Sequence, residues 1–183
     1  MEKRGFFSGA VTALTGTLTV TLAIIINGRW IGAAAVTAAA GGAIIPDFMV
    51  AYPSEALAAR FAALGEAGRA AYLVMNALDF LFAAAYGVFY LGCLGWMARR
   101  LFPARPALRW LGLIGVFGAA ADEAENVIFR GIANGGLAAA GPLATVASFM
   151  STAKYVLILA SMALVVAGLA TLAIVSLVQR ANR

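Results

Sequence analysis

Five ionisable residues and one asparagine interrupt stretches of sequence that are otherwise apolar. They are Asp79, Asp122, Glu123, Glu125, Asn126 and Lys154. An ionised side chain at the centre of a membrane costs about 2.5–3.5 kcal/mol on insertion scales, so such residues are rare there unless they bind a ligand, move protons or pair with one another. Their types and setting predict acid–base chemistry inside a bilayer.

The spacing of the Asp122–Asn126 run indicates which of its residues act together. Asp122 and Asn126 are four residues apart, and Asp122 and Glu125 are three apart. Residues at these separations share one face of a helix. Glu123 lies about 100° around the same helix, at 3.6 residues per turn. We therefore expect Asp122, Glu125 and Asn126 to face one site, and Glu123 to face another helix or the lipid border.

The depth of these groups predicts that they meet. At a rise of about 1.5 Å per residue, Asp79, the Asp122 run and Lys154 fall in one layer, nearer one surface of the membrane. Four acids in that layer would face Lys154 and Arg130 alone. Because buried like charges repel, we expect one carboxyl to keep its proton, with Asp122 or Glu125 as the functional acid, or a cation to be bound.

We predict three catalytic carboxyl groups and a set of residues that bind the substrate. The catalytic residues are Asp122, Glu125 and Asp79. The substrate-binding residues are Asn126, Lys154, Tyr72, Asn76, Tyr86, Tyr90 and Tyr155. The alternative is a structural network, in which Lys154 and Arg130 each pair with an acid and the cluster only fixes the register of the helices.

No metal site and no cofactor are expected. The chain has no histidine, and Cys93 is its only cysteine, which excludes histidine chemistry, an intrachain disulfide and a cysteine-rich zinc site. It also has no glycine-rich nucleotide loop.

The composition predicts the elements that hold these residues. Of 183 residues, 63% are hydrophobic and 11% are charged, against roughly 45–50% and about 25% in soluble domains. We expect one all-α domain, residues 1–183, that forms a four-helix membrane bundle. A span needs about 20 apolar residues. The predicted spans are residues 6–26, 71–97, 110–132 and 148–178.

The basic residues predict the orientation in the cell membrane, the inner membrane where there are two. Eight of them lie at the two termini and between the second and third spans, together with one acid. By the positive-inside rule, both termini are cytoplasmic. The net charge of +5 is then explained by topology and does not indicate a nucleic-acid partner.

Residues 27–70 are expected to lie outside the membrane. Within them, Ser54–Leu64 is predicted to form an amphipathic helix that covers the outer end of the bundle, because Leu57, Phe61 and Leu64 recur at helical spacing. Ser54 is the expected N-cap, and Gly65 the expected end. Residues 30–45 are too short to span the membrane, and either an interfacial or a re-entrant segment fits them.

The sequence resembles a group of small four-span bacterial membrane proteins over about its last three-quarters. The resemblance rests on Tyr52–Glu55, Leu64–Arg69 with Tyr72, Asp79 followed by Tyr86-Gly87, Asp122-x-x-Glu125-Asn126, and Ser148 to Lys154. Glu123 departs from the pattern, in which an apolar residue is usual, and the alanine-rich stretch before Pro46 is atypical. The resemblance implies a fold and a motif but no activity. A fainter likeness, of type only, is to small integral-membrane terpene cyclases.

Three functions remain open at this point. The first is an intramembrane enzyme that uses a carboxyl group as general acid on a lipophilic, isoprenoid-like small molecule, with membrane lipids as its other partners. The second is a proton- or cation-coupled transporter, for which four spans are few unless the chain forms a homo-oligomer. The third is a structural or accessory membrane subunit.

Overall fold

The computed structural model describes residues 7–135 and 140–182, and within these residues it contains helices and no strands. The elements are α1 (Gly9–Asn27), α2 (Ala33–Ala39), η1 (Pro46–Phe48), α3 (Ser54–Ala63), α4 (Gly65–Leu101), η2 (Pro106–Gly112), α5 (Leu113–Ala133) and α6 (Ala140–Ala181). The predicted all-α class is confirmed. The predicted cytoplasmic residues Lys3, Arg4 and Arg183, and the start of the first span at residue 6, lie outside the described residues.

Three of the helices are long and apolar enough to cross a membrane: α1, α4 and the segment Leu143–Ala181 of α6. The fourth predicted span, 110–132, corresponds to α5, whose 21 residues would reach about 30 Å at 1.5 Å per residue. Its charged residues, including Asp122 and Glu125, keep α5 out of the apolar set. The composition of the individual helices therefore supports three spans directly.

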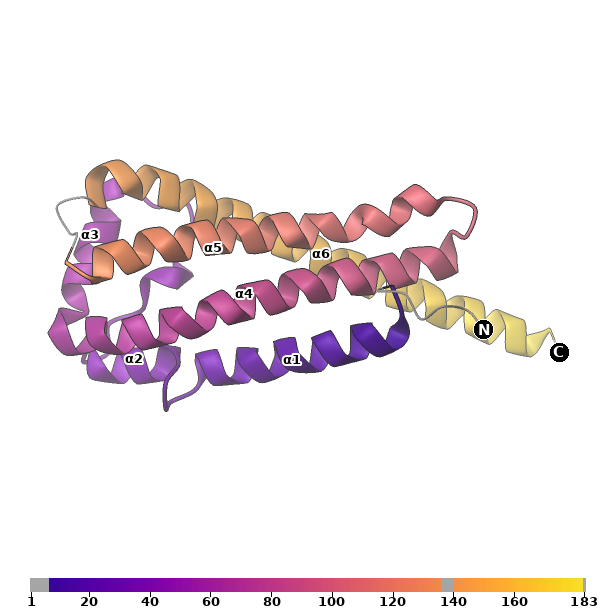
Figure 1. The fold of residues 1–183 in the computed structure, drawn as a ribbon, viewed down its shortest axis with the longest axis horizontal. Helices are drawn as coiled ribbons and strands as arrows, with labels where there is room; N and C mark the ends of the chain where they lie inside the picture. Colours follow the sequence, from indigo (N-terminus) through magenta and orange to yellow (C-terminus); the bar gives the residue numbers. More distant parts are fainter. Residues whose placement is uncertain (1–6, 136–139, 183) are drawn as a thin grey trace.

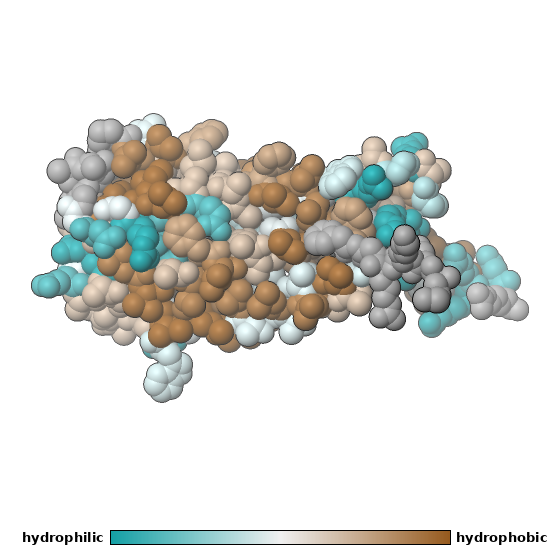
Figure 2. Space-filling model, viewed as in Figure 1, coloured by the Kyte–Doolittle hydropathy of each residue, from teal (hydrophilic) through white to brown (hydrophobic). Residues whose placement is uncertain are grey.

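The four long helices pack in the order α1, α4, α5, α6, with further contacts between α4 and α6. Figure 1 shows α6 crossing behind α5 and α4 and extending past them at one end. Helices α2 and α3 and the η1 turn lie at the opposite end, here called the α3 end. No extensive contact joins α1 to α6 within the described residues. Figure 2 shows a broad apolar zone across the middle of the molecule, with hydrophilic residues gathered toward its two ends.

Two glycines allow α4 and α5 to approach closely. A Cβ atom on Gly87 of α4 would lie 2.9 Å from the Cβ of Ala119, and one on Gly115 of α5 would lie 2.7 Å from the Cγ of Tyr90. Small residues at such contacts are typical of membrane helix packing. The close approach brings the polar residues of α4 and α5 within reach of one another.

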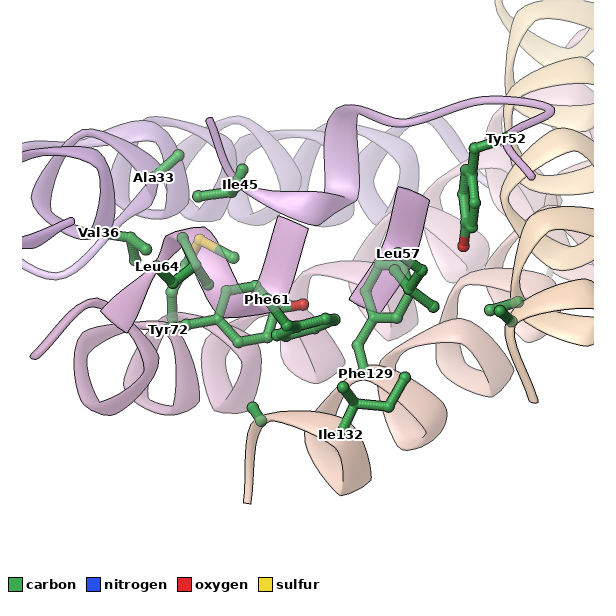
Figure 3. Close-up of a cluster of buried hydrophobic side chains, with 14 of the residues drawn as sticks. Ala33, Val36, Ile45, Tyr52, Leu57, Phe61, Leu64, Tyr72, Phe129 and Ile132 are labelled. Carbon is green, nitrogen blue, oxygen red and sulfur yellow. The ribbon is translucent and has the colours of Figure 1, made fainter. Parts of the chain in front are cut away.

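Helix α3 confirms the predicted amphipathic helix, with one correction at its start. Leu57 and Phe61 are fully buried, and Figure 3 shows Phe61 among rings from α4 and α5. Ser54 is not the N-cap. Pro53 takes that extended position, and Ser54 is already helical, so its hydroxyl binds the Glu55 carboxylate at 3.1 Å instead of a backbone N–H. Gly65 has a φ of +63° and turns the chain into α4.

Candidate functional site

Lys154 of α6 lies between two carboxylates of α5. Its Nζ donates to Asp122 Oδ1 at 3.1 Å and to Glu125 Oε2. The second oxygen of each carboxylate is also bound, because Tyr86 donates to Asp122 Oδ2 at 2.9 Å and Ser151 donates to Glu125 Oε1. All five side chains are buried. The predicted convergence of Asp122, Glu125 and Lys154 is therefore present, and we call this group the lysine centre.

A second polar group surrounds Asn126, one turn along α5 from Asp122. Asn76 of α4 donates from its Nδ2 to the Asn126 side-chain oxygen at 3.1 Å. Arg130 donates to the Leu73 carbonyl at 3.1 Å and to Asn76 Oδ1 at 3.4 Å. The structure thus pairs Arg130 with a carbonyl and an amide, and not with an acid as the structural alternative assumed. It lies a full helical turn beyond Asn126, which places its guanidinium beside α4.

A cavity of about 150 Å³ adjoins the lysine centre. Four ionisable side chains line it: Asp47, Asp79, Asp122 and Lys154. The remaining wall is largely apolar and comes from Ile26, Asn27, Ala33, Ile45, Phe48, Met75, Phe82, Tyr155 and Ile158. Lys154 is the only cationic side chain among the described residues that line this space. The cavity therefore combines an apolar wall with an excess of carboxyl groups.

Asp79 is the carboxyl group of the cavity that α4 contributes. It is buried, and within the described part of the chain no lysine or arginine forms an ion pair with it. The Asn126 side chain lies beside it. Asp79 and Asp122 thus face the same cavity from neighbouring helices, but only Asp122 has a charged partner.

Asp47, in the η1 turn, is a cavity residue that the sequence analysis missed. Its side chain is buried, and its two carboxylate oxygens have no hydrogen-bond partner. Burial raises the pKa of Asp47 to about 6, although the charge of Lys154 acts in the opposite direction. Tyr155 of α6 donates to the Asp47 backbone carbonyl at 3.0 Å and so holds the turn against the cavity. A lone acid in the apolar run Ile44–Val50 was the signal that could have identified it.

The other predicted residues divide between the cavity and its surroundings. Tyr86 binds Asp122, and Tyr155 lines the cavity. Tyr72 is fully buried beside Asp47 and does not line the cavity. Tyr90 packs edge-on against Tyr86, with ring centroids 6.1 Å apart, and does not line the cavity.

Glu123 lies where the sequence predicted, whereas Ser151 has a contact that the sequence analysis did not assign. Glu123 is half-buried and lies outside the cavity lining, as its position on the helix predicted. Ser151 lies on the same helix face as Lys154 and binds Glu125, a role that the sequence analysis did not assign to it. Three or more metal-binding side chains do not come together anywhere in the described residues.

No protein-family model, curated protein or solved structure matches the chain. The resemblance to small four-span bacterial membrane proteins, and the fainter likeness to terpene cyclases, therefore stay predictions.

Proposed function

We propose that the protein is an integral membrane enzyme that uses a buried carboxyl group as general acid on a lipophilic substrate. One observation carries the proposal: Asp79, which has no ion pair, faces an apolar cavity that it shares with the lysine centre. Intramembrane ionisable residues that face a cavity are functional in most membrane proteins.

The proposal includes α5 as a fourth span, with both termini in the cytoplasm. Its acidic residues Asp122 and Glu125 are buried against α4 and α6, whereas Phe117 and Val127 are strongly exposed. A helix with this division presents an apolar surface to lipid although its mean hydropathy is reduced by buried charges. The packing of α5 between α4 and α6 supports this assignment.

The geometry favours Asp79 over Asp122 and Glu125 as the proton donor. The latter two both bond to Lys154, and each also accepts a hydroxyl hydrogen bond, whereas Asp79 has no ion pair. An ionised Asp79 would add an uncompensated negative charge to the same buried space. We infer that Asp79 holds a proton, whereas the lysine centre stays charged. Two carboxylates with different environments divide the roles of acid and charge stabiliser.

The cavity suits the reacting end of a larger apolar molecule. Cavities of about 150 Å³ accept a molecule the size of benzene, which is comparable to one isoprenoid unit. Exposed Asn27 and Phe48 line the rim, and α1 does not close against α6, so the rest of such a chain can lie between these helices. We therefore propose an isoprenoid as the first substrate class to test.

The chemical step balances without a further reactant. Asp79 transfers its proton to a carbon of the substrate double bond, and the π electrons form the new C–H bond. The carbocation that results lies near the Asp79 carboxylate, and the rings of Phe82 and Tyr155 line the same space. Loss of a proton from a neighbouring carbon then forms a new double bond and returns the proton to the site. The product is an isomer of the substrate.

The test compares Asp79→Asn with the unchanged chain, both reconstituted in nanodiscs and incubated with a panel of isoprenoids. We expect product formation by the unchanged chain and a loss of about 10²–10⁴-fold in Asp79→Asn, the usual contribution of general acid catalysis. Glu123→Gln is the matched control, because it neutralises an acid of α5 outside the cavity. Equal turnover by Asp79→Asn and the unchanged chain would exclude Asp79 as the acid.

A further inference from the structure

A second hollow lies at the α3 end and shares no lining residue with the cavity. Its walls come from the segment Ala51–Ser54 and from the first turns of α6, and its volume is about 600 Å³. Four hydroxyl-bearing residues of α6 and the α3 segment line it together with Tyr52: Ser54, Thr145, Ser148 and Thr152. This hollow is open, and Ala51, Pro53 and Phe149 complete its lining.

Tyr52 connects this hollow to the lysine centre. Figure 3 shows its ring apart from the other aromatic rings and beside α6. Its hydroxyl lies 3.4 Å from Ser151 Oγ. Ser151 in turn donates to Glu125, and Glu125 accepts from Lys154, which lines the cavity. The contacts form one continuous series from the hollow to the cavity: Tyr52, Ser151, Glu125 and Lys154.

We propose that this series is a proton-entry path, which carries protons from the open hollow at the α3 end to the buried cavity. It rests on the proposed function only for its end point, the Asp79 carboxyl. A separate path is needed because a lipophilic substrate in the mouth of the cavity excludes water from it. The proposed isomerisation returns its proton to the site, so the path determines how fast the Asp79 proton exchanges with solvent while the mouth is occupied.

Each transfer along the path conserves atoms and charge. A proton from water adds to the Tyr52 oxygen while the original Tyr52 proton passes to Ser151 and the Ser151 proton passes to Glu125 Oε1. Rotation of the Glu125 carboxyl presents that proton to Lys154, once Lys154 has released one of its own into the cavity. The cavity is large enough for several water molecules, and its carboxyl groups offer them hydrogen-bond partners. The last transfer, to Asp79, takes place through this space.

The protonation state of Tyr52 is compatible with this role. Burial raises the pKa of Tyr52 to about 12, so its hydroxyl keeps the hydrogen that a relay needs at neutral pH. The 3.4 Å contact with Ser151 is long for an O–H···O hydrogen bond, for which about 2.7–2.8 Å is usual. We therefore expect the transfer from Tyr52 to Ser151 to limit the rate.

The test measures how fast deuterium reaches the buried carboxyl groups. The full chain in nanodiscs is mixed rapidly with D₂O buffer, and the C=O stretch of protonated carboxyl groups is followed by infrared spectroscopy. Asp79→Asn and Asp47→Asn assign the bands. The measurement is made at neutral pH and again below the Asp47 pKa of about 6, where the cavity contains at least one protonated carboxyl. No turnover is required.

Tyr52→Phe removes one hydroxyl from the path and nothing else. We expect it, and Ser151→Ala, to slow exchange by about 10²-fold, the lower end of what a positioned proton-transfer group contributes. Thr152→Val is the control, because its hydroxyl lies in the same hollow but binds the Ser148 carbonyl at 2.8 Å. Exchange as fast in Tyr52→Phe as in the unchanged chain overturns the path. Absence of an Asp79 band at neutral pH overturns the proposed acid instead, so the two failures are distinct.

Discussion

Replacing Lys154 with methionine tests the electrostatic account of the lysine centre. Methionine keeps much of the length of the side chain and removes its charge. Asp122 and Glu125 then remain buried as neighbouring carboxylates without a cation. Removing one partner from a buried ion pair costs about 3–5 kcal/mol, because the remaining charge has lost its compensation.

The structure places the expected loss at the lower end of that range. Asp122 keeps the hydrogen bond from Tyr86, and Glu125 keeps the one from Ser151. We therefore expect Lys154→Met to lower the free energy of unfolding by about 3 kcal/mol. The measurement is reversible unfolding in mixed detergent micelles, followed by circular dichroism.

A triple variant separates lost charge compensation from lost packing. Adding Asp122→Asn and Glu125→Gln to Lys154→Met removes all three charges but leaves amide oxygens to accept from Tyr86 and Ser151. Neutral replacement of a whole buried ion pair is often without cost, so we expect most of the lost stability to return. A change of less than about 0.5 kcal/mol in Lys154→Met, typical of a surface substitution, would refute the reasoning.

The remaining predictions concern the η1 turn, the contact between α4 and α5, and the orientation of the chain. The pKa of Asp47 in the folded chain, about 6, lies above its ordinary value of 3.8. Ionised Asp47 therefore destabilises the fold above pH 6. Protonation of Asp47 removes this destabilisation as the pH falls from 6 toward 4. Asp47→Asn should thus be more stable than the unchanged chain at alkaline pH, by up to about 3 kcal/mol, and this difference should shrink as the pH falls. Thermal unfolding curves at several pH values measure it. A difference that does not change with pH would contradict the prediction. Gly87→Ala should lower the stability of the fold by about 1–3 kcal/mol, because the added methyl group would contact Ala119. Gly131→Ala is the control and should be neutral or stabilising, because its added methyl group meets nothing within 4 Å. Equal effects of the two substitutions would show that α4 and α5 are not closely packed. A cysteine at position 55 of a chain without its native thiol should react with an impermeant reagent added outside the cell, and labelling only after lysis would invert the topology.

Local patterns predicted the face of α5, but contacts between distant segments completed the site. The i, i+3 and i, i+4 spacing was sufficient to place Asp122, Glu125 and Asn126 together, because it depends only on helix geometry. Arg130 obeys the same spacing relative to Asn126, yet it turns to α4, where the Leu73 carbonyl and Asn76 accept its hydrogen bonds. Helical periodicity specifies a direction but not the partner found there.

Asp47 shows why part of the site escaped prediction. It belongs to a segment that has no helical periodicity, and it reaches the cavity because the η1 turn packs against α6, 108 residues away in sequence, through the Tyr155 hydrogen bond. Hydropathy patterns describe the helices and not the loops that cover them. Four spans were predicted on similar grounds, and α5 is the one whose apolar character depends on which of its residues are buried.

The contrast between Asp79 and Asp122 connects stability with the proposed chemistry. Both are buried aspartates on adjacent helices, but only Asp122 bonds to Lys154. Asp122→Asn should lower stability by about 1.5–3 kcal/mol, the range for a hydrogen bond to a charged group. Asp79→Asn should leave stability unchanged or increase it, because no ion pair is lost, and should lower turnover by about 10²–10⁴-fold. Lost activity without lost stability is expected of a residue that serves the reaction and does not stabilise the fold. The reverse order, with Asp79→Asn destabilising and Asp122→Asn inactive but stable, would return the role of the acid to α5, where the sequence alone had placed it.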